Sequence, residues 1–195
     1  MKIRQERLSG KAAVKGTMLQ SRVSWINRNI AGGIGEIEPY LEFGDRALLT
    51  RSFIPATEWV PFQHLIRIDR AIAAAAGGPP ERVYQDLGRH SASLNLGGAY
   101  RLFTTEEPHR FFENMALLHN RFQNFGRSMY GRVSRFSGRI ELQDYFEYSP
   151  VFCTSALGYY EEALRIMNAA GPIIVTETLC QCAGDTMCQY ELKWH

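Results

Sequence analysis

The sequence predicts an α+β fold in which an N-terminal helical region precedes a domain with an antiparallel sheet. Apolar residues recur at helical spacing between residues 14 and 78, and short alternating runs flank the turn residues Ser137-Gly138 and Gly184-Asp185. The first pattern is typical of helices and the second of β-hairpins. We expect a helical region over residues 1–78. Residues 79–195 should form a domain with the order helix, helix, strand, strand, helix, strand, strand.

The N-terminal region contains the strongest helix prediction. An earlier helix carries Met18 and Ile26 on its apolar stripe and should end at the glycines of the run AGGIGE. The run EWVPFQHLIRIDRAIAAAAGG then places Phe62 and Ile72 at helical steps ahead of Gly77-Gly78. Leucine and alanine favour a helix and glycine ends it. The linker GGPP that follows is the best candidate for a domain boundary.

Two helices should open the second domain. Residues 81–96 follow two prolines, which suit the first turn of a helix. Residues 106–125 are amphipathic, with Phe112, Met115 and Phe122 along one stripe. We therefore expect both helices to pack against the sheet.

The remaining segments alternate between strand and helix patterns. Residues 129–149 form a hairpin pattern, and residues 150–171 begin with proline, keep helical spacing and end at Gly171. Residues 172–180 and 188–194 are alternating runs separated by a tight turn. These runs complete the predicted sheet.

Composition and charge exclude several classes of protein. The chain is 45% hydrophobic and 22% charged with a net charge of +2, so we expect a globular protein that binds no nucleic acid. No apolar run is long enough for a membrane span or for a signal peptide. We therefore expect a cytoplasmic protein without a membrane span.

Cysteines cluster near the C-terminus, at Cys180, Cys182 and Cys188. In a reducing compartment, clustered thiols indicate a metal site before they indicate disulfides. A hairpin would bring these thiolates within reach of one ion, and a closed tetrahedral site would need a fourth ligand from Cys153 or Glu177. Residue types alone do not choose between these two. The alternative is that the cysteines are small buried core residues.

Cys153, Gly158 and the run VTETLCQCAGDTMCQYEL together resemble the 4-vinyl reductase domain family, which includes zinc-containing sensors of small molecules. The chain is similar to short bacterial stand-alone proteins of this type. The resemblance implies a zinc ion held by Cys153, Glu177, Cys180 and Cys188, with Cys182 as the alternative to Glu177. A zinc ion with four protein ligands has no open position, so it would be structural.

The resemblance also implies an apolar pocket between the helices and the sheet, where small molecules often bind. For the aromatic side chains in this region the alternative is ordinary core packing. The candidate ligand-binding residues are Phe112, His119, Phe122, Tyr130, Phe136 and Tyr145.

Our first hypothesis for function is a cytoplasmic ligand-binding or signalling module with a structural zinc, which senses a small apolar or aromatic molecule. Such a module should form a homodimer through its N-terminal helices and report to a protein partner. The alternatives are a protein adaptor or scaffold without a ligand, and a reductase subunit of tetrapyrrole biosynthesis. We predict no catalytic residue. The chain contains no nucleophile elbow, phosphate loop or dinucleotide fingerprint, which weighs against an enzyme.

Overall fold

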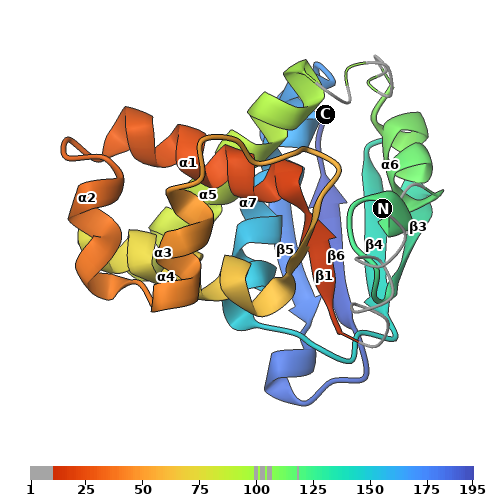
Figure 1. Cartoon of the computed structure of the whole chain (residues 1–195). Coiled ribbons are helices and arrows are strands. Elements are labelled where there is room, and N and C mark those ends of the chain that lie inside the picture. The colour runs from red at the N-terminus through yellow and green to blue at the C-terminus, as the bar shows by residue number, and fades with distance from the viewer. Residues whose placement is uncertain (1–10, 99–100, 102–103, 105–106, 118) are drawn as a thin grey trace.

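The computed structural model describes residues 11–98, 101, 104, 107–117 and 119–195, and it confirms the predicted α+β fold. A layer of helices lies beside a sheet, with one helix, α7, between them (Figure 1). The helices are α1 (Gly16–Asn29), α2 (Ile34–Ile37), α3 (Phe43–Leu49), α4 (Phe62–Ala76), α5 (Pro80–Gly97), α6 (Pro108–Leu117) and α7 (Pro150–Ile166). Short 3-10 turns are η2 (Glu38–Tyr40), η4 (His119–Arg121) and η5 (Gln181–Ala183).

The strands form a small ladder and a four-stranded antiparallel sheet with the order β3-β4-β6-β5. They are β1 (Ala13–Lys15), β2 (Trp59–Pro61), β3 (Arg127–Ser134), β4 (Ser137–Gln143), β5 (Ile174–Leu179) and β6 (Cys188–Lys193). Alternation places Ile140 and Leu142 of β4 on the buried face, opposite Tyr190 and Cys188 of β6. Helices α6 and α7 cover this face, and polar residues occupy the other, as is common for antiparallel sheets.

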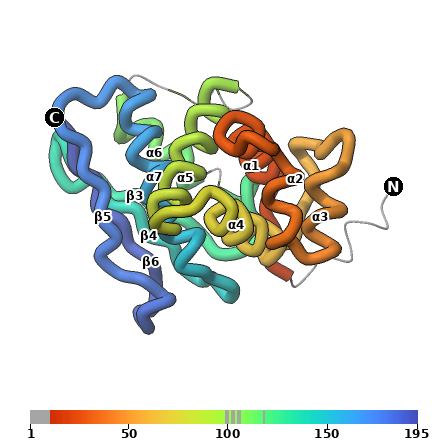
Figure 2. Tube along the Cα trace, turned by 90° about the vertical axis from the view of Figure 1, so that its left-hand side faces the viewer, coloured from red at the N-terminus to blue at the C-terminus, as the bar shows by residue number. Residues whose placement is uncertain are grey.

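Helices α5 and α7 lie side by side at very short separation (Figure 2). Each helix has a glycine at the crossing point. A Cβ atom at Gly88 would lie 1.9 Å from the carbonyl oxygen of Ser155, and a Cβ at Gly158 would lie 2.0 Å from that of Gln85. Glycine is therefore required at both positions by the close approach of the two backbones.

The N-terminal clasp consists of β1 and the segment 122–124, which follows η4. The amide of Lys15 donates to the carbonyl of Phe122 at 2.8 Å, and the amide of Asn124 donates to the carbonyl of Ala13 at 3.1 Å. The Asn124 side chain accepts from the amide of Ala13 at 2.7 Å. These bonds attach the start of the described chain to the connection between α6 and β3.

The main core packs against the buried face of the sheet and takes residues from both sides of residue 78. Val14 and Phe62 belong to it, together with Phe112, Ile140 and Tyr190. A second cluster lies within the helical layer, around Ile26 and Ile68. No helix in the described part of the chain is long and apolar enough to cross a membrane.

Candidate functional site

A cavity of about 120 Å³, which we call the central pocket, lies between the helical layer and the sheet. Helices α1, α5 and α7 form one wall, and α6, η4 and β4 form the other. Most of its lining is apolar, and a few polar side chains reach it from different elements. The apolar lining includes Met18, Phe112, Met115, Phe122, Ile140, Leu142, Phe152 and Ala156.

Arg22 forms the polar floor of the central pocket. Its Nε and Nη2 donate to the two carboxylate oxygens of Asp69, each at 2.8 Å, and the two residues are 2% and 0% exposed. Nη1 donates to the Ser21 hydroxyl at 3.2 Å, and Nη2 also donates to the Ser155 hydroxyl at 3.3 Å. A fork-to-fork pair of this kind is strong and directional, and it cancels the charge of both partners.

The opposite end of the pocket carries His119, Gln123 and Tyr145. Nε2 of His119 lies 3.2 Å from the carbonyl oxygen of Phe125 and 2.8 Å from the amide nitrogen of Gln123. Burial lowers the pKa of His119 below 6.5, which leaves the ring neutral at pH 7. The Gln123 amide lies between His119 and the Tyr145 hydroxyl, and burial raises the pKa of Tyr145. These three groups contact one another and carry no charge.

Four of the six candidate ligand-binding residues line the central pocket, namely Phe112, His119, Phe122 and Tyr145. The other two lie elsewhere. The Tyr130 hydroxyl is bonded to Nδ1 of His109 at 2.6 Å, and Phe136 is 40% exposed beside His195.

Sequence reasoning missed the polar floor of the central pocket. Arg22 stands between Leu19 and Ile26 on the buried stripe of α1. A charged residue at such a step of an apolar stripe is the one signal that could have found it.

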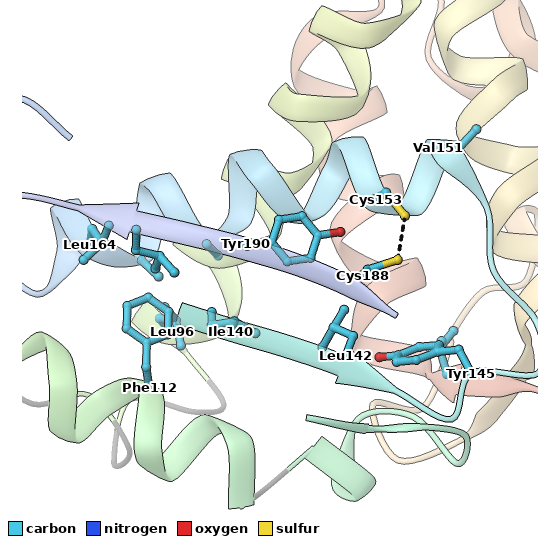
Figure 3. Packing of buried hydrophobic residues seen from close by; sticks show 14 of the residues in the cluster. Leu96, Phe112, Ile140, Leu142, Tyr145, Val151, Cys153, Leu164, Cys188 and Tyr190 are labelled. Carbon is cyan, nitrogen blue, oxygen red and sulfur yellow. Dashed lines mark hydrogen bonds between the residues drawn. The ribbon is translucent and has the colours of Figure 1, made fainter. Parts of the chain in front are cut away.

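The donor cluster consists of Cys153, Glu177, Cys180 and Cys188, whose ligand atoms all lie within 4.8 Å of one another. It joins the first turn of α7 to the end of β5 and the start of β6. The Sγ of Cys153 lies 3.8 Å from that of Cys188 (Figure 3). It lies 3.9 Å from that of Cys180.

Two further observations describe the surroundings of the donor cluster. Oε1 of Glu177 and the hydroxyl of Tyr190 are buried without a hydrogen-bond partner in the described structure. In Figure 3 the Tyr190 hydroxyl points toward the sulfur atoms. Cys182, the alternative ligand, is exposed on η5 and does not belong to the cluster.

The thiols of the donor cluster differ in their acidity. The hydrogen bond between Cys153 and Cys188 lowers the pKa of Cys188 to about 7 and raises that of Cys153. Burial raises the pKa of Cys180 to about 12. Cys188 is therefore the first of the three to become a thiolate.

No family model and no curated protein matches this sequence. Solved structures of H-NOX proteins do match it, along nearly the whole chain. The H-NOX protein from S. oneidensis in the Fe(II)NO state has a TM-score of 0.67 and 11% identity, covering 93% of this chain and 99% of that chain. The Fe(II) unliganded A71G mutant from K. algicida has a TM-score of 0.67 and 10% identity, covering 93% and 96%. An oxygen-binding H-NOX domain related to soluble guanylate cyclases has a TM-score of 0.65 and 14% identity, covering 92% of this chain and 94% of that chain.

These comparisons correct two predictions. The assignment to the 4-vinyl reductase domain family is wrong, because the matching structures are H-NOX proteins. The resemblance was carried by a short cysteine motif, whereas the H-NOX similarity includes the helical layer as well. The predicted structural zinc is also wrong, because the H-NOX structures are described by iron and haem. At 10–15% identity the comparison establishes the fold alone: this chain has the fold of H-NOX proteins.

Proposed function

We propose that this protein is a ligand-binding sensor module whose ligand occupies the central pocket. The observation that carries the proposal is a largely apolar cavity at which Arg22, His119 and Gln123 converge from different elements. Such a cavity with a few convergent polar groups is the usual form of a small-molecule site. The H-NOX fold supports this class of function, because the neighbours include oxygen-bound and nitric-oxide-ligated proteins.

Haem, which is named for those neighbours, does not fit the described residues of this chain. The cavity of about 120 Å³ is smaller than the roughly 300–1,000 Å³ of pockets for drug-sized ligands, and haem is larger than most of these. Haem also carries two carboxylates, and Arg22, the one cation among the described lining residues, is already paired with Asp69.

The contacts of His119 and His109 also argue against haem in the central pocket. Nε2 of His119 is committed to the carbonyl of Phe125, and both ring nitrogens of His109 are bonded away from the pocket. Neither ring presents a free Nε2 to the cavity as an axial ligand. We therefore propose a smaller organic ligand, apolar or aromatic over most of its surface, and we derive no role for haem.

Native mass spectrometry of protein purified from cells tests this proposal. We expect a retained organic mass that is lost in Ala156→Phe, because the larger side chain fills the pocket. Ala74→Phe is the matched control, because Ala74 is exposed on α4. A bare protein mass would contradict the proposal and favour an adaptor, and a mass retained equally by Ala156→Phe would contradict it by placing the ligand outside the central pocket. A haem absorbance band in the purified protein would contradict the fit argument.

We also propose that the donor cluster binds a metal ion with a preference for thiolate ligands. Three sulfur atoms and a carboxylate already lie within 4.8 Å, and Oε1 of Glu177 is buried without a partner. An unpaired buried carboxylate oxygen is costly, and a cation would satisfy it. Soft thiolates select transition metals over magnesium or calcium.

Dimer formation through residues 1–78, a protein partner and a cytoplasmic location stay predictions. The structure suggests how they should be tested. Removing residues 1–78 would cut Val14 and Phe62 out of the main core, so surface substitutions are the better test of dimerisation.

A further inference from the structure

The size of the central pocket limits its occupant to about one ring. An apolar cavity of about 150 Å³ is known to bind benzene. The central pocket, at about 120 Å³, is of the same order and is also largely apolar. A bicyclic ligand would not lie wholly inside a cavity of this volume, and it would extend into the open side of the pocket or press on wall residues such as Phe112 or Leu142. A single ring with one small substituent fits within this volume.

The pocket offers no net charge to a ligand. Among the described lining residues, Arg22 is the one permanently charged group, and Asp69 accepts two hydrogen bonds from it. His119 is neutral at pH 7, and the Tyr145 hydroxyl stays protonated because burial raises its pKa. A charged ligand would lose its hydration here without gaining a counter-charge. An uncharged molecule avoids this cost.

Arg22 also has one donor left. Nε and Nη2 donate to Asp69, Nη2 donates in addition to Ser155, and Nη1 donates to Ser21. A guanidinium carries five N–H groups, so one N–H of Nη1 has no acceptor within the described structure. At the other end, His119, Gln123 and Tyr145 bond to one another. The Arg22 end of the pocket therefore has a hydrogen-bond donor that a ligand can use.

We infer that the ligand of the central pocket is an uncharged molecule of about one ring that presents a hydrogen-bond acceptor to Arg22. The ring lies against the apolar wall around Phe112 and Leu142, and the acceptor, such as an amide, ketone or ether oxygen, faces the floor. This inference rests on the proposed function, since it assumes that the central pocket is the ligand site.

Three probes of similar shape test the inference by calorimetric titration at pH 7.5. Benzamide is uncharged and has an acceptor, benzoate carries a negative charge, and toluene has no acceptor. We expect benzamide to bind at least about tenfold more tightly than benzoate or toluene, because an unmade hydrogen bond or an unpaired charge costs at least that factor. Tighter binding of benzoate, or equal binding of toluene, would overturn the inference.

A paired substitution identifies the donor. Arg22→Met with Asp69→Leu removes both charges together, which avoids leaving a buried carboxylate unpaired. In this variant the preference for benzamide over toluene should disappear, and a preference that persists would overturn the role of Arg22. The comparison of the three probes on the unaltered protein stands even if the double variant fails to fold.

The failure of this inference can be separated from that of the proposed function. If none of the probes binds but native mass spectrometry shows a retained organic mass, the ligand class is wrong and the pocket proposal survives. If no probe binds and no organic mass is retained, the proposed function fails as well.

Discussion

Replacing Gly158 with alanine should destabilise the protein, because α5 and α7 touch through their backbones at this point. The added Cβ would lie 2.0 Å from the carbonyl oxygen of Gln85 and 2.7 Å from its carbonyl carbon. Ordinary van der Waals contact begins at 3.4 Å, so the helices would have to separate by about 1.4 Å. A backbone carbonyl cannot rotate away as a flexible side chain would.

The expected magnitude combines two opposing effects. Forcing extra volume into a packed interface costs about 1–3 kcal/mol, and the upper half applies here because both contacting groups are backbone. Alanine returns up to about 1 kcal/mol through its higher helix propensity. We expect a net loss of about 2 kcal/mol. The matched control is Gly97→Ala at the end of α5, where nothing lies within 4 Å of the new Cβ. Its stability should be unchanged or slightly raised.

Urea denaturation followed by circular dichroism measures this difference. The midpoint for Gly158→Ala should fall while the slope stays the same, which marks a change in stability and not in the unfolded state. Ligand affinity should fall too, because Gly88 and Ser155 of the same interface line the central pocket. A loss below about 0.5 kcal/mol, the usual range of a neutral surface change, would refute the argument from backbone contact.

Three further predictions concern the pocket, the donor cluster and the surface. Burial lowers the pKa of His119 in the folded protein below 6.5, so the unfolded chain binds a proton at this residue first as the pH falls. The contribution of neutral His119 to stability is therefore fully present above pH 6.5, and it is lost as the pH falls through the folded-state pKa. His119→Gln should reduce this loss in urea titrations between pH 7 and 5, and an unchanged pH profile would show that His119 is not its source. Added Co²⁺ should give thiolate charge-transfer absorbance that Cys188→Ser abolishes and Cys182→Ser keeps; the reverse pattern, or no absorbance with either protein folded, would exclude the donor cluster as the site. Phe43, 88% exposed on α3, is the best candidate for the predicted dimer contact, so Phe43→Asp should give a monomer by light scattering, and a persistent dimer would place the contact elsewhere.

Sequence reasoning found the elements whose signals are local. The helix over 62–76 has a long apolar stripe and a glycine stop, and the last strand alternates between Cys188 and Lys193. Strands β1 and β2 were missed because each has three residues and depends on pairing with residues distant in the sequence. The helix predicted over 106–125 ends at Leu117 in the structure, because the chain must turn before Phe122 bonds to Lys15.

The donor cluster and the central pocket also differ in whether their sequence signals are local. The spacing of Cys180 and Cys188 about a tight turn is local, so the sequence could suggest that these thiols lie together. The pair of Arg22 and Asp69 joins residues 47 positions apart, and the pocket floor that it forms depends on the crossing of several helices. The family assignment was wrong for a related reason, because it rested on a short cysteine motif and the fold depends on the arrangement of the whole chain.

The N-terminal clasp has a consequence for the order in which this protein assembles. The bond between Ala13 and Asn124 spans 111 residues, so it closes one of the longest loops in the chain, and contacts of this kind are expected to form late in folding. Phe122 and Gln123, which the clasp holds in place, are walls of the central pocket. The pocket would therefore be completed near the end of folding. A ligand that binds only the complete pocket would stabilise the folded state and would therefore oppose opening of the clasp at β1.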